Sequence, residues 1–270
     1  MRVSILGYGW YGEALAQTLL QNGYQVKVSV TSASKAEKFA TPDLIVYIAN
    51  FKADGEHYDP VFFDCDVIVV GIPPKSRHGE GADYLPKIKR IIDAIIKYRV
   101  KKVIYISSTA VYGEGNRMVT EANIPDTETE TGRILIEAEN CFRNQLSFQT
   151  TIIRFGGLVG PGRHPGRFFS GKTDIPNGRA PVNLIHRDDC TGITHAVLVR
   201  DLFGRVLNAV CSHHPAKMDF YTRASASAKL PLPGFKDELF DWKIVNSALL
   251  GNALDYSFKV ANWDDYRFDQ

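Results

Sequence analysis

The chain has 270 residues, of which 44% are hydrophobic and 23% charged, and its formal net charge is +2 at pH 7. This near balance argues against nucleic-acid or membrane partners, and the length suits one large domain with at most a small appendage. The four cysteines show no C-x-x-C pair, so neither a metal site nor a disulfide framework is expected.

The N-terminal residues predict a strand, a glycine turn and a helix. Apolar residues 3–6 precede Gly7, Gly9 and Gly12, and residues 13–20 continue as a helix. In this order the glycines allow a tight turn, close approach of the backbone to a pyrophosphate, and packing of helix on strand. We therefore expect a dinucleotide to contact Gly7, Gly9, Trp10, Tyr11 and Gly12. Because the strand starts without a basic and apolar leader, and no apolar run approaches the ~20 residues of a membrane span, a cytoplasmic location is expected.

A second strand is predicted over residues 24–31, and no acid stands at its end, where an adenosine ribose is normally bound. Hydroxyl groups and one cation stand there instead, on Thr31, Ser32, Ser34 and Lys35. They can hold a 2′-phosphate, which favours NADP over NAD, or they form a solvated loop and a helix N-cap.

Further strands are predicted at residues 44–49, 67–70, 103–107, 150–155 and 205–210, and helices at 84–98, 132–145, 188–202 and 219–228. This alternation predicts an α/β fold, a Rossmann-type doubly wound parallel sheet with a small C-terminal lobe. Gly71 and Pro73 follow the fourth strand and are expected near the adenosine, and a polar loop is expected from Pro74 to Gly81. The tail from Leu230 onward is expected to be irregular.

A glycine-rich loop follows Gly156, at the edge of the sheet where ligands of such folds bind. We expect the dinucleotide-binding domain to span residues 1–165 and a substrate-side lobe to span 166–270, with the strand near 205–210 rejoining the main sheet. Arg163, His164 and Arg167 are expected to bind an anionic ligand, because guanidinium groups match phosphate oxygens. The alternative is a solvated loop with exposed ion pairs.

Three segments resemble one family. They are residues 107–113 (SSTAVYG), 154–161 (RFGGLVGP) and 182–189 (VNLIHRDD). With the glycine turn, they are similar to the extended and atypical short-chain dehydrogenase/reductases, the group that contains NAD-dependent epimerase/dehydratases of nucleotide sugars. The glycine turn departs from the extended pattern, which would have glycine where this chain has Leu6. The resemblance implies that Ser107, Phe155 and Gly156 lie beside the nicotinamide and that His186 lies on the substrate side.

The resemblance also assigns the catalytic positions. Ser108 takes the place of the residue that polarises the substrate oxygen. If Glu139 is the family's helix glutamate, Thr131 and Leu135 occupy the positions of the acid/base tyrosine and its lysine. A threonine hydroxyl is too weak an acid for that task, and leucine cannot lower a neighbour's pKa. Tyr112 or His186 would have to replace them.

These residues also have structural interpretations, since serines can satisfy a strand end, and tyrosine and histidine can be packed in a core. Two functions stay open: an atypical epimerase/dehydratase-like enzyme acting on a small anionic substrate such as a nucleotide sugar, and a non-catalytic NAD(P)-responsive binding protein. A flavin or quinone reductase is a third interpretation, although nothing in the sequence specifies a flavin. The sequence is compatible with a homodimer.

Overall fold

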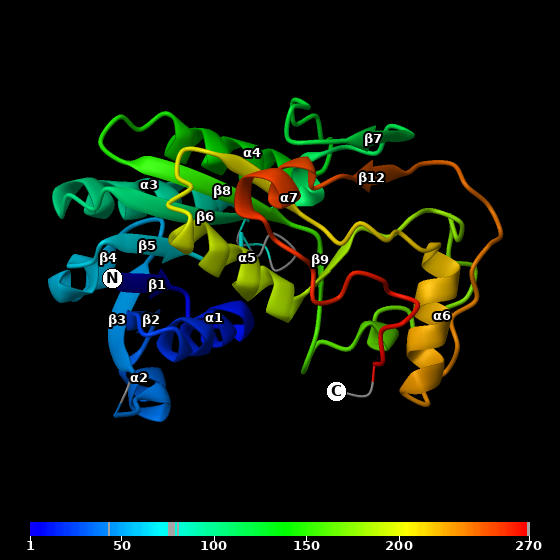
Figure 1. Cartoon of the computed structure of the whole chain (residues 1–270), viewed down its shortest axis with the longest axis horizontal. Helices are drawn as coiled ribbons and strands as arrows, with labels where there is room; N and C mark the ends of the chain where they lie inside the picture. The colour runs from blue at the N-terminus through cyan, green and yellow to red at the C-terminus, as the bar shows by residue number, and fades with distance from the viewer. Residues whose placement is uncertain (43, 75–78, 80, 269–270) are drawn as a thin grey trace.

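An eight-stranded sheet forms the centre of the molecule (Figure 1), in a computed structural model that describes residues 1–42, 44–74, 79 and 81–268. The strand order is β11-β8-β6-β5-β1-β2-β3-β4, and the pairs are parallel except β3 with β4. The strands are β1 (Arg2–Leu6), β2 (Gln25–Val30), β3 (Ile45–Phe51), β4 (Glu56–Tyr58), β5 (Val67–Val70), β6 (Lys102–Ser108), β8 (Gln149–Phe155) and β11 (Val206–Ala209). The expected Rossmann-type α/β fold is confirmed.

Helices cover both faces of the sheet (Figure 1). One apolar core joins the sheet to α1 (Trp10–Gln21), α5 (Arg187–Val199) and α7 (Ala248–Leu254). The other core joins it to α3 (Gly81–Lys97) and α4 (Glu130–Arg143). All four residues of β5 are buried, as expected of a strand with helices on both sides.

The order of the strands places a crevice beside β1. From β1 the chain runs outward through β2 to β3, and then returns to the other side of β1 as β5, β6 and β8. The strand order therefore reverses between β1 and β5. In open parallel sheets, ligands bind at the carboxyl ends of the strands at this reversal.

Short elements outside the sheet form the lobe. They are β7 (Arg117–Val119), β9 (Gly157–Val159), β10 (Leu184–His186), α6 (Lys217–Ser227) and β12 (Lys243–Val245). Strand β9 pairs with β10, and β7 pairs with β12. Figure 1 shows β7, β12 and α6 at one end of the molecule, although β7 comes from the first half of the chain. Segments from both halves of the chain therefore lie together at this end of the molecule.

Several short elements were not predicted, among them β7, β9, β10 and β12. The polar run after β2 enters a short helix, α2 (Ala33–Phe39), and β4 adds an antiparallel edge to the sheet. The tail expected to be irregular contains α7, which buries Leu250 and Leu254 one turn apart. Its seven residues are too few to give a clear helical period. Of the polar loop expected at 74–81, residues 75–78 and 80 lie outside the described residues.

Candidate functional site

The glycine turn joins β1 to α1 at the crevice. Gly7 has a φ of +109°, in the region that favours glycine, and its N–H donates to Ser29 Oγ at 3.1 Å. A Cβ on Gly12 would lie 2.1 Å from the Gly7 carbonyl oxygen, so only glycine lets the helix pack this closely. Gly9 precedes α1 with no side-chain cap, and a Cβ there would meet nothing within 4 Å. The N-terminus of α1 is thus open to a ligand, and its unpaired N–H groups favour an anion.

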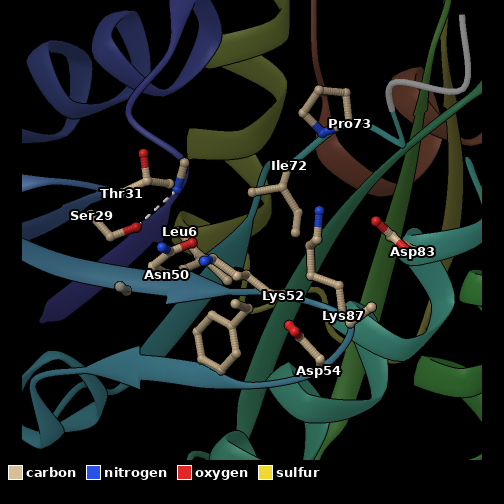
Figure 2. A pocket seen from close by; sticks show the side chains of 14 residues that line it. Leu6, Ser29, Thr31, Asn50, Lys52, Asp54, Ile72, Pro73, Asp83 and Lys87 are labelled. Atoms are coloured by element: carbon tan, nitrogen blue, oxygen red, sulfur yellow. Dashed lines mark hydrogen bonds between the residues drawn. The ribbon is translucent and has the colours of Figure 1, made fainter. Parts of the chain in front are cut away.

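A cavity of about 720 Å³ lies at the carboxyl ends of β1, β2, β3 and β5 (Figure 2). It contains three of the expected cofactor residues, Gly7, Thr31 and Pro73. The sequence did not point to five polar residues that also line it: Asn50, Lys52, Asp54, Asp83 and Lys87. Figure 2 shows the Lys87 side chain extending from α3 toward Ile72. Asn50 lies near the carboxyl end of β3 and Lys52 directly follows the strand, and this position was the signal that could have found them.

The polar run after β2 lies at the start of α2. Thr31 and Lys35 are exposed. The hydroxyls of Ser32 and Ser34 hydrogen-bond to each other at 3.2 Å. Ser32 is the N-cap residue of α2 by position, but its side chain makes no capping hydrogen bond. The run therefore keeps polar groups at the surface beside the cavity.

Tyr11 and Phe155 pack into the core beside the crevice. Their rings meet edge to face with centroids 5.2 Å apart, and the Tyr11 hydroxyl bonds to Thr194 Oγ1 at 2.7 Å. Gly71 directly follows β5, and a Cβ on it would lie 3.6 Å from the Tyr11 ring. A Cβ on Gly156 would lie 2.8 Å from the Asn183 carbonyl oxygen, so glycine lets two segments cross there.

A buried polar network lies beneath the carboxyl end of β6. Glu139 accepts from Ser107 Oγ at 2.6 Å, and from Arg154 Nε at 2.9 Å and Nη2 at 2.5 Å. The side chains of Arg154 and Glu139 are only 2% and 1% exposed. Ser107 is therefore part of this structural network. Ser108 is half-buried, and its Oγ accepts from the Ala110 N–H at 3.2 Å.

Tyr112 belongs to the same network. Tyr112 is 1% exposed. Its hydroxyl accepts a hydrogen bond from Arg154 Nη1 at 2.6 Å and lies 3.1 Å from Asn208 Oδ1. Burial raises the pKa of the Tyr112 phenol, and the Arg154 guanidinium offsets part of the rise. A phenol held in this way is not available to a substrate, so we do not retain Tyr112 as the acid/base.

Thr131 and Leu135 lie on α4. Thr131 is half-buried in the first turn, whereas Leu135 is 3% exposed and packs in the core. A lysine at position 135 would enter this core. The side chains of α4 therefore do not reproduce a tyrosine–lysine pair at these positions.

The two ends of the glycine-rich loop contact different parts of the protein. Trp10 Nε1 donates to the Pro161 carbonyl oxygen at 2.7 Å, and the Arg163 guanidinium lies 5.5 Å from the Trp10 ring centroid. Arg163 thus lies beside the glycine turn. His164 instead caps a short helix through Gly166 N–H, and Arg167 is exposed. Burial lowers the pKa of His164, and the Arg167 charge lowers it further.

His186 is the N-cap residue of α5. Its Nδ1 accepts from the Asp188 N–H at 3.3 Å, and burial lowers its pKa. It lines a second cavity, of about 580 Å³, between the start of α5 and the C-terminal segment. Lys259, Tyr266 and Arg267 line it as well, and composition alone gave no sign that they meet there.

Among the described residues, no group of three or more His, Cys, Asp or Glu side chains is placed to hold a metal ion. Among those same residues, no helix is long and apolar enough to span a membrane.

Comparisons with known proteins agree with this geometry. The chain is 33% identical to Protein YeeZ of Escherichia coli (strain K12) over 265 residues, which cover 96% of each protein. A conserved protein of unknown function from Silicibacter pomeroyi DSS superposes with a TM-score of 0.79 at 21% identity, covering 97% of this chain and 95% of that one. The UDP-glucuronic acid 4-epimerase from Bacillus cereus, solved with NAD, gives a TM-score of 0.76 at 20% identity over 98% of both chains. Residues 7–190 match the family described as NAD(P)H-binding. The glycine turn at the strand reversal and this match agree, and the chain belongs to the NAD(P)H-binding family.

Proposed function

We propose that this protein binds NADP(H) and a nucleotide sugar in one cleft, as an epimerase/dehydratase-like protein in which the tyrosine–lysine pair is replaced. The observation that carries the proposal is the cavity at the carboxyl ends of β1, β2, β3 and β5, bordered by the glycine turn. Its size is within the range of small-molecule sites. The UDP-sugar epimerases that share the fold support the choice of substrate class.

The preference for NADP rests on the end of β2. No acid from β2 lines the cavity, and the acids that do, Asp54 and Asp83, come from beyond β3 and from α3. Lys52 and Lys87 accompany them in the lining. A 2′-phosphate would meet Thr31, Lys35 and the two serines between them. We therefore expect calorimetry to give tighter binding of NADPH than of NADH.

A lysine variant tests this assignment. Lys35→Ala is expected to weaken the binding of NADPH by about tenfold, since a hydrogen bond to a charged group contributes about 1.5 kcal/mol or more. The affinity for NADH should not change. Lys38→Ala, one turn farther along α2, is the matched control and should bind both as the parent does. Equal affinity of the parent for NADPH and NADH would contradict the NADP assignment.

Chemistry, if present, must proceed without the family's tyrosine and lysine. Thr131 and Leu135 stand at those positions, and the Tyr112 hydroxyl is held by Arg154. Turnover of UDP-glucose or UDP-glucuronate, followed by NMR of the sugar and by absorbance of the bound cofactor, is therefore expected to survive Thr131→Ala. Loss of turnover in that variant would show that the threonine hydroxyl participates.

The buried state of Tyr112 also favours a second function, a non-catalytic NADP(H)-responsive binding protein. The turnover assay with nucleotide sugars also distinguishes the binding protein from the enzyme. A nucleotide sugar that raises the melting temperature in the presence of NADPH, but is recovered unchanged, would support the binding protein. An altered sugar would support the enzyme.

The proposal extends to location and assembly. A cytoplasmic location agrees with four cysteines that all remain free thiols. Sedimentation of the purified protein will distinguish a monomer from the homodimer that the sequence allows.

A further inference from the structure

Two arginines share one tryptophan beside the glycine turn. The guanidinium carbons of Arg163 and Arg187 each lie 5.5 Å from the Trp10 ring centroid. Trp10 is the first residue of α1, and Arg187 is the first residue of α5. The clamp, as we name Trp10, Arg163 and Arg187, thus brings two cations to the N-terminal ends of two helices.

This arrangement is unfavourable as it stands. Neither arginine has a carboxylate within salt-bridge distance in the part of the chain that the structure describes. Like charges repel, and the positive end of a helix dipole favours anions over cations. Stacking on a tryptophan recovers only part of this cost. Two guanidinium groups at this place therefore indicate an anion that binds between them and the turn.

Buried donors at the same point support an anion. Arg187 Nε is buried and has no hydrogen-bond partner among the described residues. The side chain of His186 is 6% exposed, and its Nε2 also has no hydrogen-bond partner in the part of the chain that the structure describes. Because His186 Nδ1 accepts a hydrogen bond and burial disfavours the charged ring, Nε2 carries the proton and is a donor. Unsatisfied buried donors are costly, and a bound acceptor removes the cost.

A glycine lets the glycine-rich loop pack closely against these groups. A Cβ on Gly160 would lie 3.0 Å from Arg187 Cβ, 3.3 Å from Trp10 Cζ2 and 3.4 Å from His186 Nε2. Gly160 has a φ of +151°, so a side chain is also disfavoured by the backbone. The missing side chain lets the loop lie directly against the start of α1.

We infer that the clamp binds the pyrophosphate of the dinucleotide, with Arg163 closing over it from the glycine-rich loop. The inference rests on the dinucleotide binding of the proposed function. It assigns Arg163 to the cofactor, whereas the sequence grouped Arg163 with His164 and Arg167 on the substrate side. Guanidinium groups suit this task, because they bind phosphate oxygens through two parallel hydrogen bonds.

The experiment is calorimetry on the full chain with NADPH, ADP and adenosine as probes. Arg163→Gln and Arg187→Gln are each expected to weaken the binding of NADPH and of ADP by about tenfold, which is the effect of losing one charge-assisted hydrogen bond. Adenosine, which has no phosphate, should bind all variants equally. Arg200→Gln is the matched control, since Arg200 ends the same helix α5 and its side chain is 53% exposed. It should bind every probe as the parent does.

Two outcomes would overturn the inference. One is unchanged affinity of both variants for NADPH and ADP. The other is unchanged affinity for NADPH together with weaker binding of UDP-glucose in its presence, which would assign the clamp to the substrate. If Arg187→Gln fails to fold, the affinities of Arg163→Gln alone test the inference, because Arg163 is exposed and its replacement should not affect folding. Failure of the parent to bind NADPH or ADP would instead refute the proposed function.

Discussion

Removing the Glu139 carboxylate should destabilise the protein more than any surface change. Glu139→Ala would leave the Arg154 guanidinium and the Ser107 hydroxyl without their acceptor, in surroundings where Glu139 and Arg154 are 1% and 2% exposed. Breaking a buried ion pair from one side costs about 3 to 5 kcal/mol. Arg154 keeps its bond to the Tyr112 hydroxyl, so we expect the lower half of that range.

Urea unfolding measures this loss directly. Glu137→Ala is the control on the same helix, since Glu137 is exposed and its loss should change the free energy of unfolding by no more than about 0.5 kcal/mol. Adding Arg154→Met to Glu139→Ala should recover part of the stability, because the double variant buries no unpaired charge. A loss below about 1 kcal/mol in Glu139→Ala alone would refute the reasoning.

Two further outcomes are expected. Leu135→Lys should lower the free energy of unfolding by about 3 kcal/mol or more, because it would place an ammonium group in the core. Leu135→Met should lower it by less than about 1.5 kcal/mol, and equal effects would contradict the burial argument. Stability should also fall as the pH drops from 7.5 to 5.5, because burial lowers the pKa of four histidines below that of a free histidine. The unfolded chain then takes up protons that the folded chain does not, and urea midpoints that stay constant over this range would contradict this reasoning. The four are His164, His186, His195 and His214.

The fold could be predicted from the sequence because local patterns determine it. The glycines between β1 and α1 need specific backbone geometry, and β5 reads as an unbroken apolar run. The alternation of strands and helices then leaves few topologies. Helix α7 and strand β12 were not predicted because they are short and because contacts with distant residues stabilise them. Val245, for example, donates its N–H to Asn183 Oδ1 at 2.7 Å.

The site was less predictable because its residues meet only in three dimensions. Gly7, Thr31 and Pro73 could be expected in the cavity, since each follows a strand. Nothing in the sequence indicates that Tyr112 bonds to Arg154, which lies 42 residues away. In the same way, Arg163 was grouped with its neighbours in the chain, and only the fold reveals that it stacks on Trp10. Side-chain partners across such separations leave no local pattern.

A ribosome releases β7 long before β12, the strand with which it pairs. Strand β8 likewise waits for β11, which covers its outer edge only after β9, β10 and α5 have been made. During synthesis the N-terminal part of a chain folds first, and an uncovered strand edge can pair with another molecule. The nascent protein is therefore most prone to aggregate in the interval between β8 and β11. A polypeptide stalled before Lys243 would hold a formed glycine turn, whereas β7 would still lack its partner strand.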